Sequence, residues 1–187
     1  VAGDHLHSLD EALEYCQELF QNNQRVVIEE KLVGQEFSLM CFSDGTSLVP
    51  MPIVQDNKRA YLDDKGPNTG GMGSYSTANH SLPFLTSDNV EQALKINAQV
   101  ITALQEFTQS NYLGVLYGGF IATAKGVYVI EFNARFGDPE SLNVLSLLES
   151  DFMDLCLALI AGKLSSEAVI FANKATVCKY AVPEGYP

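Results

Sequence analysis

The sequence predicts an α+β fold in which antiparallel sheet is flanked by helices. Two hairpin signals support this class: strand-like segments flank Ser43-Asp44-Gly45, and two apolar segments meet at Lys125-Gly126. Segments with the helical spacing of apolar residues separate the two hairpins. Hairpins that are separated by helices in this way are typical of α+β proteins.

The N-terminal elements begin with a helix. Ser8 and Glu11 have the spacing of a capping box, and apolar residues follow at helical spacing as far as about residue 22. Residues 26–30 form a β-branched run and predict a strand. Residues 36–42 and 46–49 flank the first glycine turn and predict a hairpin.

The second half of the chain contains the longest helical pattern, over residues 88–110. The apolar segments 114–124 and 127–132 predict the second hairpin. A helix should follow over 139–162, with Ser150-Asp151 as the candidate for a break, because Pro139 suits its first position, and Asp138 could then act as its cap. Residues 176–180 predict a last strand.

Composition and charge exclude several classes of partner. The formal net charge of −12 should repel polyanions, so nucleic acid and anionic membranes are not expected as partners. No stretch reaches the roughly 20 apolar residues of a membrane helix. The four cysteines are far apart in sequence, which favours free thiols in a reducing cytoplasm. A small phosphorylated ligand stays compatible with the charge, because a metal ion and a few aimed donors can outweigh the mean field.

Residues 52–83 show neither the helical nor the strand period. A compact domain rarely carries about 30 residues without regular structure unless they have a function. Within them, Gly66–Gly73 holds four glycines in eight residues. Such a run can form a nest of amide donors for an anion, and a tight surface turn is an equally good interpretation.

Polar residues that suit a metal close the second hairpin. In a strand, period two places Glu131 and Asn133 on one face and Phe132 on the other. A carboxylate and an amide oxygen are hard ligands that suit Mg²⁺, although a solvated strand face is the alternative. Arg135 follows and could hold a carboxylate or a phosphate.

Two further charged groups allow two interpretations each. Glu29, Glu30 and Glu36 are three acids near one connection, either a solvated edge or acceptors for the hydroxyl groups of a sugar. The run Gln55–Arg59 places an acid beside two basic residues, which by itself is usually only solvated.

Four motifs occur together in one order. EEKLVGQE (residues 29–36), PMPIVQDNKR (50–59), GPNTGGMGSYS (66–76) and EFNARFGDPE (131–140) closely resemble the phosphoribosylamine–glycine ligase family of the ATP-grasp superfamily. The similarity is collinear from about residue 25 to about residue 160. It implies ATP-dependent joining of glycine to 5-phosphoribosylamine through glycyl phosphate, a step of de novo purine biosynthesis.

The resemblance also implies a role for each matching residue. For ATP, it implies adenine contacts from the hinge at Glu29, Glu30 and Leu32, ribose contacts from Glu36 and an apolar contact from Phe120. For Mg²⁺ (or Mn²⁺), it implies Glu131 and Asn133 as ligands, with Arg135 neutralising charge during phosphoryl transfer. For glycine and phosphoribosylamine, it implies Asp56, Lys58, Arg59, Asn68, Thr69, Gly70, Gly71 and Asp138.

The resemblance finally implies how the chain is organised. Residues 1–165 would be the second lobe of an ATP-grasp domain and 166–187 the start of a C-terminal domain. The first lobe and an N-terminal domain would then be absent, so we expect the isolated chain to be inactive and its partners to include the remaining domains of the enzyme. Two alternatives stay open: another ATP-grasp carboxylate–amine ligase, or a non-catalytic module that only binds nucleotide.

Overall fold

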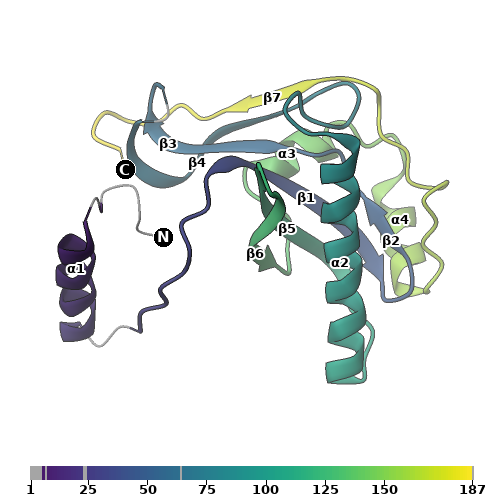
Figure 1. Ribbon diagram of the computed structural model, residues 1–187. Helices are drawn as coiled ribbons and strands as arrows, with labels where there is room; N and C mark the ends of the chain where they lie inside the picture. Colours follow the sequence, from purple (N-terminus) through teal and green to yellow (C-terminus); the bar gives the residue numbers. More distant parts are fainter. Residues whose placement is uncertain (1–5, 7, 23–24, 64, 187) are drawn as a thin grey trace. The chain divides into compact units, whose positions relative to one another are not determined.

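The computed structural model describes residues 6, 8–22, 25–63 and 65–186. The chain divides into two compact units, Val1–Val33 and Gly34–Pro187, and each is described by itself (Figure 1). Among the described residues, no helix has both the length and the apolar character that crossing a membrane requires.

Among its described residues the first unit contains one helix, α1 (Leu9–Gln21), which confirms the predicted helix. Ser8 caps it, since its hydroxyl accepts a hydrogen bond from the amide of Glu11 at 3.2 Å. The predicted strand over residues 26–30 is wrong, because residues 25–33 form neither helix nor strand. Val27 and Ile28 are 79% and 83% exposed. A β-branched run becomes a strand by pairing with a neighbour, and no described strand pairs with this one.

The second unit is built on a four-stranded antiparallel sheet in the order β2-β1-β5-β6. Both predicted hairpins are confirmed. The strands are β1 (Gly34–Asp44), β2 (Leu48–Pro50), β5 (Leu113–Thr123) and β6 (Gly126–Asn133). The long helix α2 (Ser87–Thr108) packs on one face of this sheet, and α4 (Phe152–Ile160) packs on the other (Figure 1).

The strand β1 is buried on both faces. Leu39 and Cys41 belong to the core beneath α2, whereas Met40 and Phe42 belong to the core beneath α4. Successive side chains of a strand point to opposite faces, so one apolar strand joins two cores. Burying each such side chain contributes about 1.5–3 kcal/mol, which makes this sheet the most strongly stabilised part of the unit.

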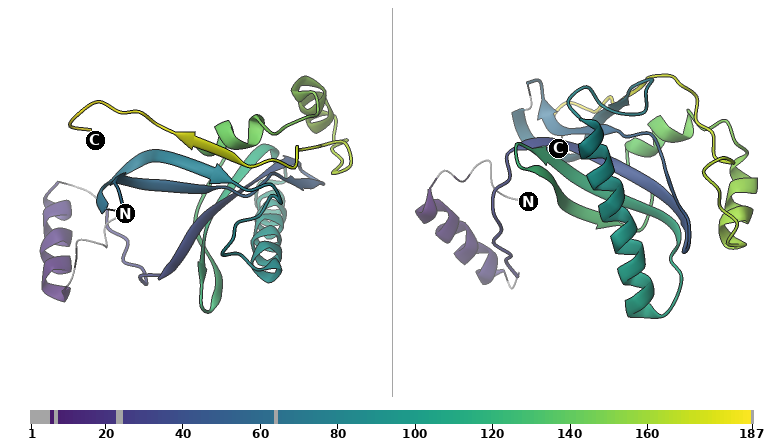
Figure 2. Two further views of the ribbon diagram at one scale, coloured as in Figure 1. Left: turned by 90° about the horizontal axis from the view of Figure 1, so that it is seen from above. Right: turned by 45° about the vertical axis from the view of Figure 1, so that its right-hand side comes forward.

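A second sheet of three antiparallel strands has the order β3-β4-β7. Its strands are β3 (Gln55–Tyr61), β4 (Lys65–Ser76) and β7 (Thr176–Lys179), and the yellow β7 runs beside the blue hairpin in Figure 2. The expectation that residues 52–83 lack regular structure is therefore wrong. The β3–β4 pairing shifts register between Asn57 and Arg59 and again before Tyr61. Because the paired residues are mostly polar or glycine and the pairing is irregular, the sequence shows no alternation of apolar and polar residues that would predict these strands.

The short helix α3 (Glu140–Leu145) begins one residue later than predicted, with Pro139 at its N-cap and no side-chain cap. Asp138 is therefore not the cap of this helix. The buried side chain of Asn143 fixes α3 to the second sheet: its amide donates to Thr176 Oγ1 at 3.1 Å, and the Ser74 hydroxyl donates to its carbonyl oxygen. These hydrogen bonds hold α3 against β4 and β7.

The helix α2 confirms the predicted long helix and packs closely on β5. Its fully buried Asn97 donates a hydrogen bond to the carbonyl oxygen of Leu39 at 3.1 Å. Gly118 lies directly opposite. A Cβ atom on Gly118 would lie 2.5 Å from Asn97 Oδ1 and 2.5 Å from Cε2 of Phe120, which is also fully buried.

We therefore expect Gly118→Ala to destabilise the protein by about 1–3 kcal/mol, because neither buried neighbour can move away without strain. The matched control is Gly70→Ala, since a Cβ atom on Gly70 meets no atom within 4 Å. Thermal denaturation of the two variants measures the difference. Equal melting temperatures for both would contradict this packing.

Candidate functional site

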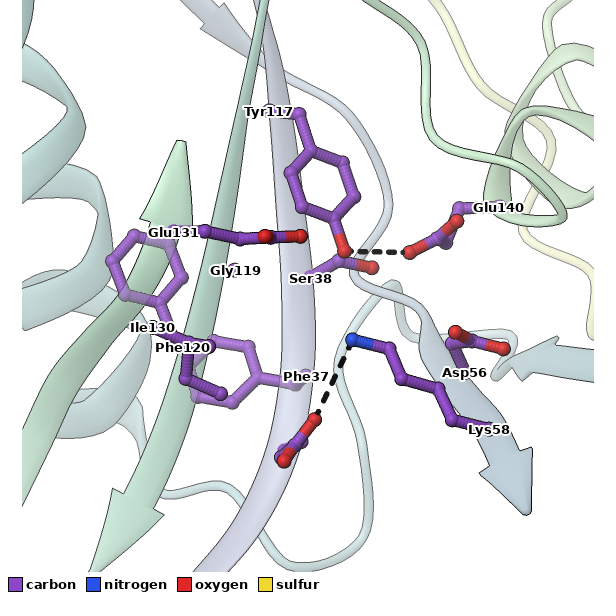
Figure 3. Close-up of a pocket in the computed structure, with 11 residues that line it drawn as sticks. Phe37, Ser38, Asp56, Lys58, Tyr117, Gly119, Phe120, Ile130, Glu131 and Glu140 are labelled. Atoms are coloured by element: carbon purple, nitrogen blue, oxygen red, sulfur yellow. Dashed lines mark hydrogen bonds and ion pairs between the residues drawn. The ribbon is translucent and has the colours of Figure 1, made fainter. Parts of the chain in front are cut away.

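A cavity of about 220 Å³ lies between the two sheets of the second unit, on the face of the first sheet opposite α2. Its lining comes from β3, β4, β5, β6, the connection from β6 to α3 and the start of α3: Asp56, Lys58, Thr69, Gly70, Tyr117, Glu131, Asn133, Arg135, Gly137, Asp138 and Glu140. A smaller depression continues it toward β1 and adds Glu36, Phe37, Ser38, Gly119, Phe120 and Ile130 (Figure 3).

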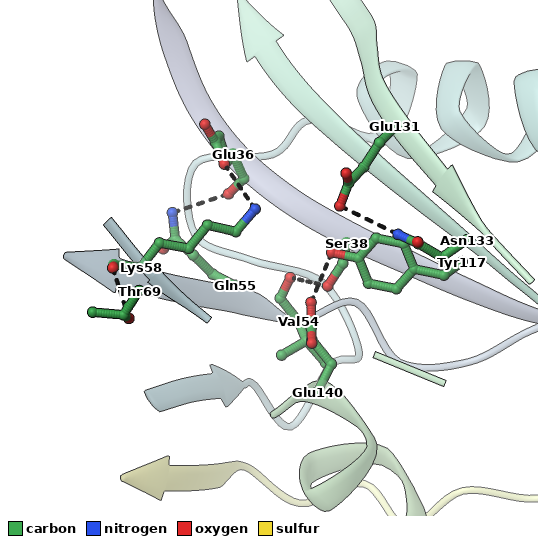
Figure 4. A network of polar contacts seen from close by, with 10 residues as sticks. All are labelled: Glu36, Ser38, Val54, Gln55, Lys58, Thr69, Tyr117, Glu131, Asn133 and Glu140. Atoms are coloured by element: carbon green, nitrogen blue, oxygen red, sulfur yellow. Dashed lines mark hydrogen bonds and ion pairs between the residues drawn. The ribbon is translucent and has the colours of Figure 1, made fainter. Parts of the chain in front are cut away.

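The end of β6 presents its polar residues to this cavity. Glu131 and Asn133 share one face, and the Asn133 amide donates to Glu131 Oε1 at 3.2 Å (Figure 4). Phe132 points to the other face and packs edge-on against Phe120, with ring centroids 6.4 Å apart. The predicted alternation of these three residues is confirmed. Both oxygen-bearing side chains line the cavity, as a shared ligand would require.

Two carboxylates face β6 from the other side of the cavity. Glu140, at the start of α3, is only 2% exposed and accepts a hydrogen bond from the Tyr117 hydroxyl at 2.8 Å (Figure 3). Asp56 lies on β3, and its Oδ1 is buried with no hydrogen-bond partner among the described residues.

The surroundings of Asp56 perturb its carboxyl. The pKa of that carboxyl is raised to about 7: desolvation is the largest cause, the negative charge of Glu140 adds to it, and Lys58 opposes the shift. Desolvation also raises the pKa of the Tyr117 hydroxyl, and the adjacent Glu140 adds to that effect. Tyr117 therefore stays protonated and serves as a hydrogen-bond donor to Glu140.

Two basic side chains line the same cavity. Lys58 Nζ lies 3.8 Å from Glu36 Oε2, and the two side chains are 38% and 51% exposed. An exposed pair at this distance contributes little, so Lys58 can turn toward a ligand. Arg135 is exposed and donates to the carbonyl oxygen of Phe136 at 2.8 Å. Both cations are thus held loosely enough to meet an anion.

The acids outnumber these two bases. The carboxylates that line the cavity and its continuation are Glu36, Asp56, Glu131, Asp138 and Glu140. Such a site favours cations, and Glu131 with Asn133 offers the hard oxygen ligands that suit Mg²⁺. In the part of the chain that the structure describes, no three metal-ligating acids, histidines or cysteines converge. A magnesium ion would fit here with two protein ligands and the rest from water or phosphate, as is usual for that ion.

The structure brings together most of the residues that the sequence suggested. Those that line the cavity or its continuation are Glu36, Asp56, Lys58, Thr69, Gly70, Phe120, Glu131, Asn133, Arg135 and Asp138. Phe120 is fully buried and stacks on Phe37, with ring centroids 5.5 Å apart. Its contact with adenine stays a prediction.

Three of the suggested residues lie outside the cavity lining. Arg59 donates to the carbonyl oxygen of Gly66 at 2.8 Å, which closes the β3–β4 hairpin, and Asn68 pairs opposite Arg59. Gly71 packs against Pro139, the N-cap residue of α3, since a Cβ atom on Gly71 would lie 2.7 Å from Cδ of Pro139. Their roles toward substrates stay predictions.

The predicted adenine hinge lies in the first unit. Glu29 and Glu30 are exposed and Leu32 is half-buried, in a segment without helix or strand. Their contacts with adenine stay predictions as well.

Sequence reasoning assigned no role to three residues that shape the site. Glu140 stands in a motif, but its burial depends on the distant Tyr117, which no motif contains. Tyr180 follows β7, and its hydroxyl donates to Asp138 Oδ1. Tyr117 and Glu140 are 23 positions apart in the sequence, and Asp138 and Tyr180 are 42 positions apart. No local sequence pattern therefore indicates these two contacts.

The comparisons with known proteins bear on this site. A family model described as the phosphoribosylglycinamide synthetase ATP-grasp (A) domain matches residues 5–141. The chain belongs to this family. Membership confirms the resemblance found in the sequence and, with it, the α+β class and the ATP-grasp fold.

Relatives of this ATP-grasp family are similar along the whole chain. A phosphoribosylamine–glycine ligase of Methanocella arvoryzae is 52% identical, and one of Methanosarcina barkeri is 55% identical, each over 187 residues. The crystal structure of a phosphoribosylamine–glycine ligase from Thermotoga maritima is 30% identical with a TM-score of 0.83, and covers 97% of this chain and 46% of that one. The chain spans 43% of the length of the two curated relatives.

The raised pKa of Asp56 predicts a pH dependence of stability. Its folded-state pKa of about 7 exceeds the unfolded value of about 3.9, so the folded state binds the proton more tightly. Stability should therefore fall as the pH rises from about 4 to 7. Asp56→Asn removes this loss, and we expect its melting temperature relative to wild type to be higher at pH 8 than at pH 5.

The matched control is Glu106→Gln, which neutralises an exposed carboxylate on α2. Its melting temperature should follow that of wild type at both pH values. If Asp56→Asn also follows wild type at both, the Asp56 carboxylate is not destabilised by its surroundings.

Proposed function

We propose that the complete polypeptide is a phosphoribosylamine–glycine ligase, which joins glycine to 5-phosphoribosylamine at the expense of ATP in purine biosynthesis. The observation that carries this proposal is the cavity between the two sheets. There Glu131, Asn133 and Arg135 on one side face Asp56, Lys58 and the glycine-rich strand β4 on the other. In a chain of this family, we expect the first group to contact the nucleotide and the second group to contact glycine and phosphoribosylamine.

On the nucleotide side, Glu131 and Asn133 would hold Mg²⁺ or Mn²⁺, which when bound neutralises phosphate charge and orients the nucleotide. The glycine carboxylate attacks the γ-phosphorus of ATP, and glycyl phosphate and ADP are formed. Arg135 stabilises the charge on the transferring phosphoryl group. Glu36 accepts hydrogen bonds from the ribose, while Phe120 and the segment Glu29–Leu32 contact adenine.

On the substrate side, the amine of phosphoribosylamine displaces phosphate from glycyl phosphate, and the amide product forms. Lys58 and Arg59 attract the anionic groups of these substrates, and Asp56 and Asp138 bind their amino groups. The strand that contains Asn68, Thr69, Gly70 and Gly71 offers backbone amides at close approach. The glycine-rich motif favours this ligase over other ATP-grasp ligases, because most of them do not share it.

We further propose that residues 1–165 are the second lobe of the ATP-grasp domain and that residues 166–187 begin a C-terminal domain. The length of the relatives supports this organisation, since the chain spans only 43% of them. The other lobe would cover the nucleotide, so the experiments below use the complete enzyme.

The metal assignment predicts the effect of two substitutions. Glu131→Gln should abolish most ligase activity without unfolding the protein, because a metal ion held by Glu131 and Asn133 would lose its charged protein ligand. Asn133→Asp should be milder, since it keeps an oxygen ligand. The measurement is the rate of product formation as a function of Mg²⁺ concentration, with thermal denaturation as the control for folding. A near-normal rate for Glu131→Gln at low Mg²⁺ would show that the ion binds elsewhere.

The ribose assignment predicts a selective loss of nucleotide affinity in Glu36→Ala. Hydrogen bonds to a charged acceptor contribute about 1.5–3 kcal/mol each, so the dissociation constant for ATP should rise roughly tenfold or more. Loss of the exposed ion pair with Lys58 accounts for at most about 1 kcal/mol of this. Affinity for glycine should hardly change.

Calorimetric titration with ATP and 2′-deoxy-ATP tests the ribose assignment. Wild type should prefer ATP, and Glu36→Ala should lose that preference. The exposed α2 residue Glu106, changed to Ala, is the control and should keep it. A Glu36→Ala protein that still prefers ATP would exclude Glu36 as the ribose acceptor.

A further inference from the structure

One polar atom of the site has no partner to satisfy it. Asp56 Oδ1 is shielded from solvent and, within the described part of the chain, accepts no hydrogen bond. A buried acceptor without a donor costs free energy, so native proteins rarely keep one without a reason. The fold itself therefore leaves the Asp56 carboxylate without the donor that would satisfy it.

The neighbours of Asp56 do not supply that donor. The Tyr117 hydroxyl is directed to Glu140, at 2.8 Å, as Figure 3 shows. Lys58 Nζ lies 3.8 Å from Glu36 Oε2. On β4, Gly71 has no side chain, and a Cβ atom there would lie 3.2 Å from Asp56 Oδ1.

The surroundings of Asp56 bring its pKa close to neutrality. Desolvation is the largest cause of the raised pKa of about 7, the negative charges of Glu140 and Glu36 add to it, and Lys58 opposes it. A carboxylate with a pKa near neutrality can take a proton from the attacking amine as its nitrogen gains positive charge, and can release that proton again without a large barrier. A carboxylate of ordinary pKa would only bind an ammonium group.

We propose that Asp56 is the proton acceptor for the amine that attacks the acyl phosphate. This inference rests on the proposed ligase function and assigns a step within it. Glu140 acts as a positioning residue, because its carboxylate is fixed by Tyr117 and its charge raises the proton affinity of Asp56. Asp56 lines the cavity together with Glu131 and Arg135, where the acyl phosphate would form.

In this step the amine replaces phosphate on the acyl carbon of glycyl phosphate. The lone pair of the amine nitrogen forms a C–N bond with the acyl carbon, and the bond from that carbon to the phosphate oxygen breaks. Phosphate leaves with the electron pair. One proton passes from the nitrogen to the Asp56 carboxylate, and Asp56 later releases it to solvent.

The experiment is the pH dependence of kcat/KM for phosphoribosylamine in the complete ligase. Wild type should lose activity below an apparent pKa near 7. Asp56→Asn should reduce kcat by about 10²–10⁴-fold, with the KM for ATP unchanged, and its residual activity should lack this acid limb. Asp56→Glu keeps a base and should restore part of the rate and the acid limb.

A third variant tests the positioning role. Glu140→Gln keeps an acceptor for the Tyr117 hydroxyl but removes the charge, so the acid limb should move to lower pH. The control is Glu106→Gln on α2, which should keep the wild-type profile. An acid limb that stays in place in Glu140→Gln would overturn the role of Glu140.

The results separate this inference from the function on which it rests. If wild type forms no glycinamide ribonucleotide, the proposed function fails and the inference fails with it. If wild type is active and Asp56→Asn keeps kcat and the acid limb, only the inference is overturned. A raised KM for phosphoribosylamine with kcat unchanged would also overturn it, because Asp56 would then only bind the amine.

Discussion

The rest of the structure depends on the continuous pairing of β1 with β5. Eleven consecutive residue pairs, from Gly34 with Thr123 to Asp44 with Leu113, run without a shift in register. Because side chains alternate between faces, a slip of one residue would exchange every residue between the α2 face and the cavity face. The burial of β1 on both faces opposes such a slip. The same pairing therefore places Tyr117 in the cavity and Phe120 in the core.

The second sheet forms under a different constraint, since little apolar surface holds it. No residue of β3 is buried, and its pairing with β4 shifts register. Side-chain hydrogen bonds to the backbone compensate, such as that from Thr69 Oγ1 to the carbonyl oxygen of Lys58 at 2.9 Å (Figure 4). Polar side chains and glycines that would weaken an ordinary strand line the cavity here. This sheet therefore has less hydrophobic stabilisation and presents polar groups to the cavity.

The same contrast explains what the sequence could predict. The two hairpins of the first sheet, the helix α2 and the alternation of Glu131 with Asn133 are local patterns with strong periods, and all were predicted correctly. The strands β3 and β4 were missed because their residues follow no hydrophobic period. A strand was wrongly predicted over residues 26–30, because propensity does not supply a pairing partner. Most residues of the site came from motifs, whereas the contact of Tyr117 with Glu140 depends on the fold.

The segment after α4 shows how far the site extends along the chain. The family model ends at residue 141, yet Thr176 binds Asn143 of α3 and Tyr180 binds Asp138 at the cavity. The amide of Tyr180 also donates to the carbonyl oxygen of Met72 at 3.1 Å, which ties this segment to the glycine-rich strand. Glu140 begins the helix that Asn143 anchors. The position of this buried acid beside Asp56 thus depends on a strand that lies about 40 residues further along the chain.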